Sequence, residues 1–488
     1  MEGRRIPRCM STQHPDNVSI PFFAQDTVLE GEDEIQEAYY AFSHLGCDEQ
    51  MWDCEGKEVD NYIIKKLLTK YPDYFAGQRL GRDVFITLRV PNPTVERAEA
   101  KILLETLESI PRSFDAAKLV YGDDTPPVFE VILPMTASAK CIDRVASYYR
   151  DFVVGKQDRP FSAGDITIAQ WIGEFHPERI DVIPLFEDME HMLGAHRLVQ
   201  EYLRGKDIRR QRVFLARSDP AMNYGLIAAV VFNKIALRRL HVLSGETGVE
   251  ILPIIGVGTA PFRGNLSPRT VPRITREYPS VYTFTIQSAF KYDYPPDEVR
   301  AAVRALHDRT PKAPPEIDEA RCLAICERYV QEYQRQITEL APVINQVARY
   351  VPGRRKRKLH IGLFGYSRSL GATSLPRAIT FNAALYSIGM PPELLGLSAL
   401  SDDDLAFLRG VYVNLDDDLA DAVRCLNLDA GFVPRELKDR LHDLAAEHAP
   451  DPQHAEMTAR IARAARENDS HPIAEALVRA AHLRRFLG

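Results

Sequence analysis

The chain of 488 residues lacks several features that would assign it to a specialised class of protein. No run of about 18 apolar residues occurs, so no transmembrane helix is expected. Arg4, Arg5 and Arg8 are not followed by an apolar run, so a secretory signal is not expected either. The seven cysteines form no C-x-x-C pair, which predicts reduced thiols and a cytoplasmic protein. A formal net charge of −7 does not favour nonspecific binding to nucleic acid.

The composition that is present, 45% hydrophobic and 26% charged residues, is typical of a large globular protein. Near its start the chain carries an unusually polar segment, CMSTQHPDN (9–17). One interpretation is a turn in which Ser11, Thr12 and Asp16 bond backbone groups. The other is a functional segment, in which His14 is the side chain best suited to proton transfer near neutral pH.

Short runs rich in Val, Ile, Leu and Phe predict strands that are buried on both faces, as in parallel sheets. The predicted strands cover residues 49–53, 84–90, 128–135, 181–188, 212–219, 249–256, 281–288 and 359–367. Helical patterns follow most of them, and parallel strands need such crossover helices. The fold class predicted is therefore α/β, a (β/α)8 TIM-type barrel with large additional α-helical segments.

Two details of this fold are left open by the pattern. The segment RCMSTQ near the start of the chain is an alternative barrel strand, and it would displace one of the eight. Beyond residue 395 only helical patterns occur. We therefore predict a catalytic barrel over residues 1–395 and a helical extension packed on it over residues 396–488.

Chemistry in such barrels is placed at the carboxyl ends of the strands. The predicted strand ends and the loops after them carry Asp53 and Glu55, Arg89, Glu187 and Asp188, Ser218 and Asp219, Arg263, Gln287 and Lys291, and Ser367 and Arg368. Carboxylates on two neighbouring strands suit Mg²⁺ or Mn²⁺. The arginines around them suit a phosphate or carboxylate substrate. The alternative is that each of these charges is only a solvated loop residue.

Two further segments allow two interpretations each. The loop GVGTAPFRGN (256–265) follows a strand, and its three glycines predict an anion cradle made of backbone N–H groups. It fits neither a Walker loop nor a dinucleotide-binding turn. The basic run RRKRK (354–358) is interpreted as a solvated approach to the last strand, with a nucleic-acid or targeting role as the alternative.

Five motifs, in this order, resemble phosphoenolpyruvate carboxylase, and more closely its shorter, archaeal-type branch. They are MSTQHPDN, PLFEDMEHM, ARSDPAMNYG, GVGTAPFRG and LPRAITFNA. The resemblance implies a helix-rich (β/α)8 barrel that carboxylates phosphoenolpyruvate with bicarbonate. The products would be oxaloacetate and phosphate, formed through carboxyphosphate and a metal-stabilised pyruvate enolate. It also implies Mg²⁺ or Mn²⁺, a homotetramer, and no nucleic-acid or membrane partner.

Individual residues match the motifs of that family. His14 resembles its essential histidine, which serves the second step, and Arg263 resembles the arginine that guards the reactive intermediate. Glu187 and Asp219 match its two metal-binding carboxylates. The residues assigned to substrate binding are Arg377, matched by its motif, Arg89 and Gln287, matched loosely, and Arg368 and Lys291.

The sequence also departs from the long bacterial and plant branch of the family. Met222, Ile255 and Val257 stand where that branch has lysine, histidine and arginine, and its second pocket arginine after RAI is not visible here. The missing anion contacts are therefore expected from Arg89, Arg368 and Lys291. Two alternatives stay open. One is another Mg²⁺-dependent barrel enzyme acting on pyruvate or its enol phosphate, as an aldolase or phosphotransferase, and the other is a non-catalytic anion sensor.

Overall fold

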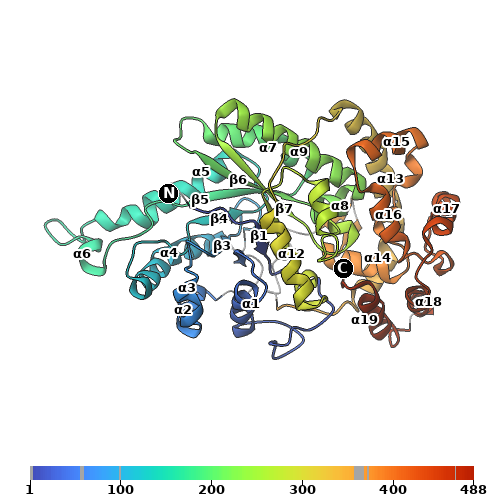
Figure 1. Cartoon of the computed structure of the whole chain (residues 1–488), viewed down its shortest axis with the longest axis horizontal. Coiled ribbons are helices and arrows are strands. Elements are labelled where there is room, and N and C mark those ends of the chain that lie inside the picture. The colour runs from blue at the N-terminus through green and yellow to red at the C-terminus, as the bar shows by residue number, and fades with distance from the viewer. Residues whose placement is uncertain (1–3, 55–59, 98–99, 357–367, 371–372, 468) are drawn as a thin grey trace.

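The computed structural model describes residues 4–54, 60–97, 100–356, 368–370, 373–467 and 469–488. Eight parallel strands form a closed barrel at its centre (Figure 1). The strands are β1 (Cys9–Ser11), β2 (Glu49–Asp53), β3 (Phe85–Arg89), β4 (Glu130–Leu133), β5 (Asp181–Phe186), β6 (Arg210–Ala216), β7 (Glu250–Gly256) and β8 (Thr283–Ile286). The predicted fold class is confirmed.

The barrel is closed by the strand at the beginning of the chain. β1 pairs in parallel with β2 on one side and with β8 on the other, with Met10 opposite Glu49 and opposite Thr285. The alternative strand in RCMSTQ is therefore confirmed. The predicted strand at 359–367 lies outside the described residues, and the barrel is complete without it.

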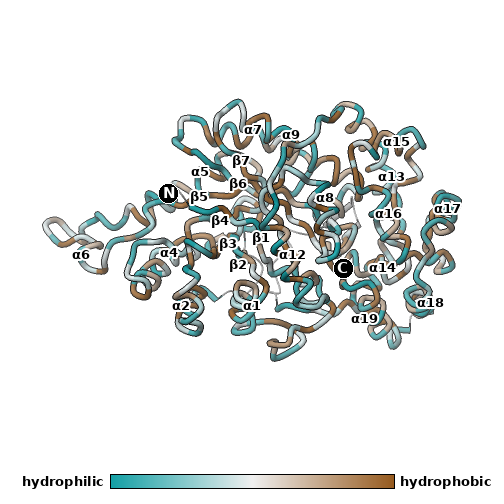
Figure 2. The backbone as a smooth tube through the Cα atoms, viewed as in Figure 1, coloured by the Kyte–Doolittle hydropathy of each residue, from teal (hydrophilic) through white to brown (hydrophobic). Residues whose placement is uncertain are grey.

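The strands form because both of their faces are buried. One face is filled by a compact apolar cluster inside the barrel, which includes Met51, Ile183 and Phe214. The other face packs on helices, and apolar stretches accordingly run along the central strands (Figure 2). Side chains alternate between the two faces, so residues two apart on a strand share an environment.

Helices connect the strands and surround the barrel. They are α1 (Glu32–Ser43), α2 (Ile63–Lys70), α3 (Pro72–Gly77), α4 (Ala100–Tyr121), α5 (Ala139–Tyr148), η1 (Tyr149–Val154), η2 (Gly155–Asp158), α6 (Ile168–Ile172), α7 (Met189–Leu203), α8 (Ser218–Tyr224), α9 (Leu226–Thr247), η3 (Pro261–Arg263), α10 (Val271–Glu277), α11 (Ser288–Tyr292) and α12 (Pro296–Asp308). Over the described part of the chain, no helix has the length and apolar character needed to cross a bilayer.

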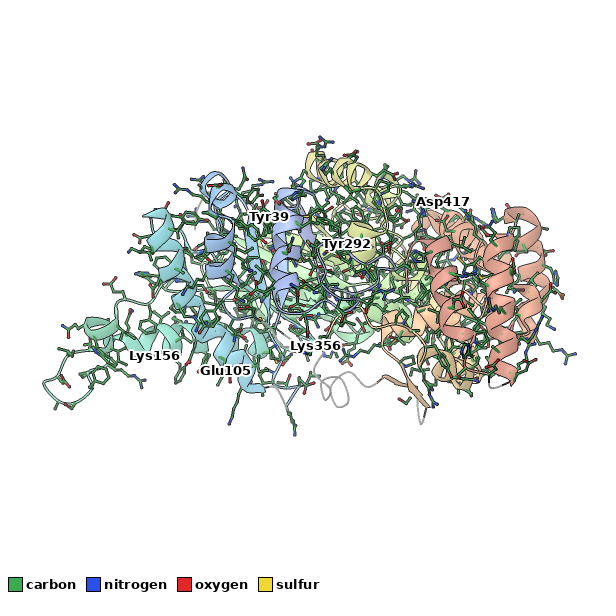
Figure 3. The ribbon with its side chains drawn as sticks, turned by 90° about the horizontal axis from the view of Figure 1, so that it is seen from below. Tyr39, Glu105, Lys156, Tyr292, Lys356 and Asp417 are labelled. Carbon is green, nitrogen blue, oxygen red and sulfur yellow. The ribbon has the colours of Figure 1, made fainter. Side chains whose placement is uncertain are left out.

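After the barrel, the chain is mostly helical. A long helix, α13 (Glu319–Ala348), precedes a two-stranded antiparallel sheet of β9 (Arg368–Leu370) and β10 (Thr373–Leu375). The helices that follow are α14 (Ala378–Ser387), α15 (Asp402–Val411), α16 (Leu415–Val423), α17 (Lys438–His448), α18 (Pro452–Glu467) and α19 (Ile473–Arg484). Figure 3 shows several of them gathered at one end of the molecule. The division of the chain at residue 395 stays a prediction.

Candidate active site

The carboxyl ends of the barrel strands open onto one cavity of about 300 Å³. In parallel barrels this end carries the ligand site, because all eight strand ends meet there. Seven of the nine residues predicted for the site line this cavity. They are His14, Arg89, Glu187, Asp219, Arg263, Gln287 and Arg377.

The alternation of side chains along the strands explains why this cavity is polar. Met51 and Leu185 belong to the apolar cluster inside the barrel. Two residues further along, Asp53 and Glu187 face the same interior and line the cavity. The site is therefore the outermost layer of the barrel interior, where carboxylates and arginines replace the apolar side chains.

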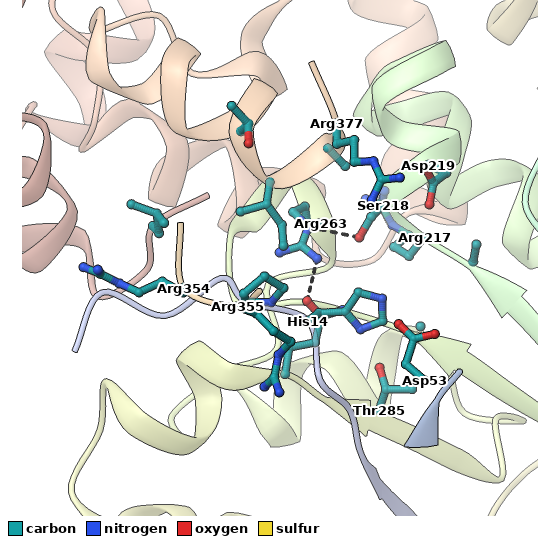
Figure 4. A pocket seen from close by; sticks show the side chains of 18 of the residues that line it. His14, Asp53, Arg217, Ser218, Asp219, Arg263, Thr285, Arg354, Arg355 and Arg377 are labelled. Carbon is teal, nitrogen blue, oxygen red and sulfur yellow. Dashed lines mark hydrogen bonds between the residues drawn. The ribbon is translucent and has the colours of Figure 1, made fainter. Parts of the chain in front are cut away.

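His14 follows β1, and its backbone is held from two sides. Its carbonyl oxygen accepts hydrogen bonds from the amide of Asp16 at 3.0 Å and from the amide of Ser288 at 3.2 Å. The ring Nδ1 lies 2.9 Å from Thr12 Oγ1, and the ring lies beside Asp53 (Figure 4). The polar groups of this segment thus position the imidazole in the cavity.

Arg263 lies in the wall of the cavity and is only 1% exposed. Its Nη1 donates to Asp16 Oδ2 at 3.2 Å and to the carbonyl oxygen of Gly488 at 2.9 Å. Its Nε donates to Ser218 Oγ at 3.1 Å, and its Nη2 donates to Gln287 Oε1 (Figure 4). Burial lowers the pKa of Arg263, and the Asp16 carboxylate opposes that shift. The guanidinium therefore ties together four segments that meet at the site.

The glycine loop does not form the anion cradle expected of it. The amide of Gly258 donates to Arg263 O at 2.8 Å, and the amide of Gly264 donates to Pro261 O at 3.1 Å, so both donors are used within the loop. These glycines serve close packing instead. A Cβ atom on Gly258 would lie 3.0 Å from Gln287 Oε1, and Gly264 has a φ of 124°.

The two predicted metal ligands come from neighbouring strands. Glu187 follows β5, and Asp219 is the second residue of α8, which follows β6. Glu187 Oε2 accepts the amide N–H of Met135 at 2.8 Å. Within the described ranges no group of three or more His, Cys, Asp or Glu side chains could hold a metal ion. Two carboxylates still fit Mg²⁺ or Mn²⁺, because these ions bind oxygen ligands and keep positions for water or substrate.

Two predicted arginines line the same cavity, although they lie far apart in the sequence. Arg89 ends β3, and its Nε lies 3.8 Å from Asp53 Oδ1. Arg377 directly precedes α14, and Ala378, Ile379 and Thr380 in the first turn of that helix also line the cavity. A helix N-terminus carries partial positive charge, so this part of the wall suits an anion.

The two remaining predicted residues are placed differently. Lys291 is 1% exposed, and its Nζ donates to Ser11 Oγ, Thr12 O and Glu37 Oε1 at 3.1, 2.9 and 2.9 Å. These bonds use all three ammonium hydrogens, and Lys291 does not line the cavity, so its assignment to substrate binding stays a prediction that these contacts do not support. Arg368 begins β9, in the two-stranded sheet rather than at a barrel strand end.

Two arginines of the basic run belong to the site, which corrects its interpretation as solvated. Arg354 and Arg355 are 8% and 6% exposed and both line the cavity. Arg354 Nη2 donates to Val18 O at 2.9 Å. Arg355 donates to Glu34 Oε1 at 2.7 Å and to Glu37 Oε2 at 2.8 Å, which fixes it against α1.

Arg217 is a further site residue that motif matching did not select. It follows β6 directly, is 1% exposed and donates to Phe262 O at 3.3 Å. With it, six arginines and three carboxylates line the cavity. They are Arg89, Arg217, Arg263, Arg354, Arg355 and Arg377, with Asp53, Glu187 and Asp219. This arrangement suits an anionic substrate beside a divalent cation.

Residues 6–488 match the model of the phosphoenolpyruvate carboxylase family. A phosphoenolpyruvate carboxylase from Methanothermobacter thermautotrophicus is 59% identical over 99% of this chain and 100% of the relative. One from Methanospirillum hungatei is 57% identical with the same coverage, and one from Pyrococcus abyssi is 53% identical over 91% of this chain and 93% of the relative. The solved malate synthase of Haloferax volcanii covers 65% of this chain and 80% of its own, with a TM-score of 0.39 and 11% identity, which is too weak a similarity to bear on function.

Proposed function

The chain belongs to the phosphoenolpyruvate carboxylase family, and on this premise we propose that its barrel cavity converts phosphoenolpyruvate and bicarbonate into oxaloacetate and phosphate. The observation that carries the proposal is the cavity itself. It joins a pair of carboxylates, a ring of arginines and one histidine at the carboxyl end of the barrel. Phosphoenolpyruvate carries a phosphate and a carboxylate, so it needs both a cation site and several guanidinium groups.

Glu187 and Asp219 are the proposed ligands of Mg²⁺ or Mn²⁺. When bound, the ion would neutralise charge on the substrate carboxylate and on the enol oxygen. Glu187 is held in place by the amide of Met135, and Asp219 by its position in the first turn of α8. The protein thus supplies a fixed pair of oxygen ligands and leaves room for substrate oxygens.

The first half-reaction is phosphoryl transfer. An oxygen of bicarbonate attacks phosphorus, and the bond from phosphorus to the enol oxygen breaks. The products are carboxyphosphate and the enolate of pyruvate. Guanidinium groups spread the charge of the transferring phosphoryl group. Arg89, Arg377 and Arg217 are the proposed groups for this step, because they line the cavity from three different elements.

The second half-reaction makes the carbon–carbon bond. His14 takes the proton of carboxyphosphate, which then splits into CO₂ and phosphate, and the enolate carbon attacks CO₂. Arg263 is proposed to hold carboxyphosphate, with Gln287 orienting the guanidinium. Water must be kept away, because protonation of the enolate would give pyruvate instead. The burial of Arg263 in the cavity wall supports this role.

The proposal includes the setting in which the enzyme works. We propose a homotetramer and a cytoplasmic location, with phosphoenolpyruvate and bicarbonate as partners. All seven cysteines are free and buried, which is consistent with a reducing compartment. Light scattering that gave the monomer mass of 55.2 kDa would disprove the oligomer.

A coupled assay for oxaloacetate tests the function directly. Product formation should require phosphoenolpyruvate, bicarbonate and Mg²⁺ or Mn²⁺ together, with one phosphate released for each oxaloacetate. Bicarbonate-independent turnover of phosphoenolpyruvate would favour another Mg²⁺-dependent barrel enzyme, such as an aldolase or a phosphotransferase. Binding of phosphoenolpyruvate without any turnover would favour an anion sensor.

A further inference from the structure

The segment between η1 and β5 projects from the barrel as an arm, defined here as residues 155–179. It contains η2 and α6, and it lies at the end of the molecule opposite the C-terminal helices (Figure 1, Figure 3). No residue of the arm is buried. A segment of this length without a buried side chain gains little from the hydrophobic effect in a single copy of the chain.

The arm nevertheless exposes large apolar side chains. Phe161 is 53% exposed, Ile166 46%, Trp171 67% and Ile172 57%. Phe152, at the base of the arm, is 57% exposed. Single exposed apolar residues are common, but gathered patches of this kind mark interaction sites.

The arm is an ordered structure. Thr167 and Gln170 form a capping box at the start of α6, and Pro160 pairs with Thr167 in an antiparallel bridge. The rings of Phe161 and Trp171 meet edge to face with centroids 5.3 Å apart. Fixing a backbone in this way costs conformational entropy, which burial of side chains normally offsets. A partner that covered the exposed apolar side chains of the arm would supply this burial.

The base of the arm lies against α4. The ring of Phe114 on α4 lies 5.0 Å from that of His176 in the arm. Near the end of the same helix, Leu119 is 88% exposed and Val120 is 50% exposed. The end of α4 thus exposes apolar side chains of its own, in addition to those of the arm.

The charges around the arm restrict the partner. Residues 150–179 contain four basic and five acidic side chains, so the segment carries charges of both signs and no basic excess. They are Arg150, Lys156, Arg159 and Arg179, with Asp151, Asp158, Asp165, Glu174 and Glu178. Nucleic acid or an anionic lipid surface would require a basic excess. A mixed surface instead complements its own copy, since each sign can face the other across a twofold axis.

We propose that the arm binds a second copy of this chain, with Phe161 and Trp171 packing on the partner's arm and on the end of its α4. Aromatic side chains bury ~150–250 Å² each, so two such arms with the surrounding polar atoms would remove roughly 1,000 Å² from water. That is about the area that a specific interface needs. The inference rests on the homo-oligomer proposed above and adds the surface through which one contact is made.

The decisive experiment compares the intact protein with Trp171→Asp and with Phe161→Asp, by light scattering over a range of concentrations. Loss of a central aromatic anchor should raise the dissociation constant of this contact about 30-fold or more. Because no arm residue is buried, both variants should keep the native circular dichroism spectrum, which shows that the barrel still folds. Val242→Asp, at a 43% exposed apolar position on α9, is the matched control and should keep the native mass.

Fluorescence gives a second readout, because the chain has only two tryptophans. Trp52 is 1% exposed, whereas Trp171 is 67% exposed. Association through the arm should shift the tryptophan emission to shorter wavelength as protein concentration rises, and Trp171→Phe should abolish that shift.

If Trp171→Asp leaves the mass unchanged, the arm contact is overturned while the oligomer stands. A monomeric native protein would overturn both. A shift caused by anionic vesicles, and not by protein concentration, would show a membrane surface as the occupant and would also overturn the proposal. Carboxylation of phosphoenolpyruvate is measured separately and does not depend on any of these outcomes.

Discussion

The two ends of the barrel interior carry charges on the same strand faces, but they use them differently. At the amino end, Arg212 is 2% exposed and donates to Glu49 Oε2 at 2.7 Å and to Glu130 Oε2 at 3.0 Å. Burial opposes the charge of Arg212, but the two carboxylates outweigh it and raise its pKa. These charges are satisfied by one another within the barrel.

At the carboxyl end, the corresponding side chains open onto the cavity. Glu49 and Asp53 lie on the same face of β2, four residues apart, yet Glu49 is sealed against Arg212 and Asp53 lines the cavity. A closed ion cluster is costly to break, because removal of one side chain leaves the opposite charge buried without a partner. An open cluster with more arginines than carboxylates contributes to binding of an anion. The comparison predicts that substitutions at the amino end act on stability and those at the carboxyl end act on turnover.

The largest expected effect is on stability, from Arg212→Met. Removing the guanidinium leaves Glu49 buried without its cation, and breaking a buried pair in this way costs about 3–5 kcal/mol. The free energy of unfolding in urea measures the loss. Arg212→Met combined with Glu49→Gln should recover part of it, because no carboxylate is then stranded at that position. A loss below about 1 kcal/mol in the single variant would break the comparison.

At the other end, Asp219→Asn should lower turnover by orders of magnitude, about 1,000-fold, while the free energy of unfolding changes by less than about 1 kcal/mol. The activation curve with Mg²⁺ or Mn²⁺ should move to higher concentration. Asp188→Asn is the control, since Asp188 is adjacent to Glu187 but caps α7 through the amide of His191 at 3.0 Å. If Asp219→Asn and Glu187→Gln both keep normal metal dependence, the metal site lies elsewhere.

His14→Asn should separate the two half-reactions. Phosphoryl transfer does not need the imidazole, whereas decomposition of carboxyphosphate does, so oxaloacetate formation should fall about 100-fold while phosphate is still released. The enolate then takes a proton from water and appears as pyruvate. Arg263→Gln should shift the products the same way. Phosphate, pyruvate and oxaloacetate are counted in one reaction, and equal loss of phosphate and oxaloacetate without pyruvate would contradict the assigned roles.

Much of the fold was predictable, because the strands between residues 49 and 288 are continuous apolar runs. The strand that closes the barrel was less visible. β1 has only three residues and is followed at once by polar groups, so its local pattern predicts a strand weakly. Its place is set by pairing with β2 and β8, which are distant in sequence. Such pairing depends on residues far apart in the chain, so the local pattern of apolar residues does not predict it.

The site was predictable where a residue follows a strand or belongs to a motif, as with His14 and Asp219. It was not predictable for Arg354 and Arg355, because a run of basic residues usually stays solvated. They can be buried here because Val18 O and the carboxylates of α1 accept their hydrogen bonds. The position of Lys291 outside the cavity was unpredictable for the converse reason: its partner, Glu37, lies on a helix far away in sequence.

A buried carboxyl that does not line the cavity sharpens the comparison. Glu393 is buried beside Tyr386, and burial raises the pKa of its carboxyl to about 8. The folded protein therefore keeps a proton that the unfolded chain loses near its ordinary pKa of 4.5. The free energy of unfolding should fall as pH rises towards 8. Glu393→Gln should make this fall smaller in urea unfolding between pH 5 and 8, and an unchanged slope would show that Glu393 is ionised. Part of the slope should remain, because the pKa values of Asp293 and Asp418 are also raised, to about 7.

The smallest effect is expected where both side chains of an ion pair are exposed to solvent. Arg269 Nε donates to Glu298 Oε2 at 2.8 Å and Arg269 Nη2 donates to Glu298 Oε1 at 3.0 Å. The pair is bidentate, as is the pair of Arg212 with Glu49, in which Nη1 and Nη2 donate. The side chains are 52% and 37% exposed, however, so water solvates both charges whether or not they pair. Glu298→Gln should therefore leave the urea unfolding midpoint almost unchanged, and added salt should reduce even that small difference. The matched variant is Glu49→Gln, which removes one charge from another bidentate pair, inside the barrel. If the two substitutions had equal effects, geometry rather than burial would set the strength of these pairs, and the contrast between the interior ion cluster and the solvated charges would lose its physical basis.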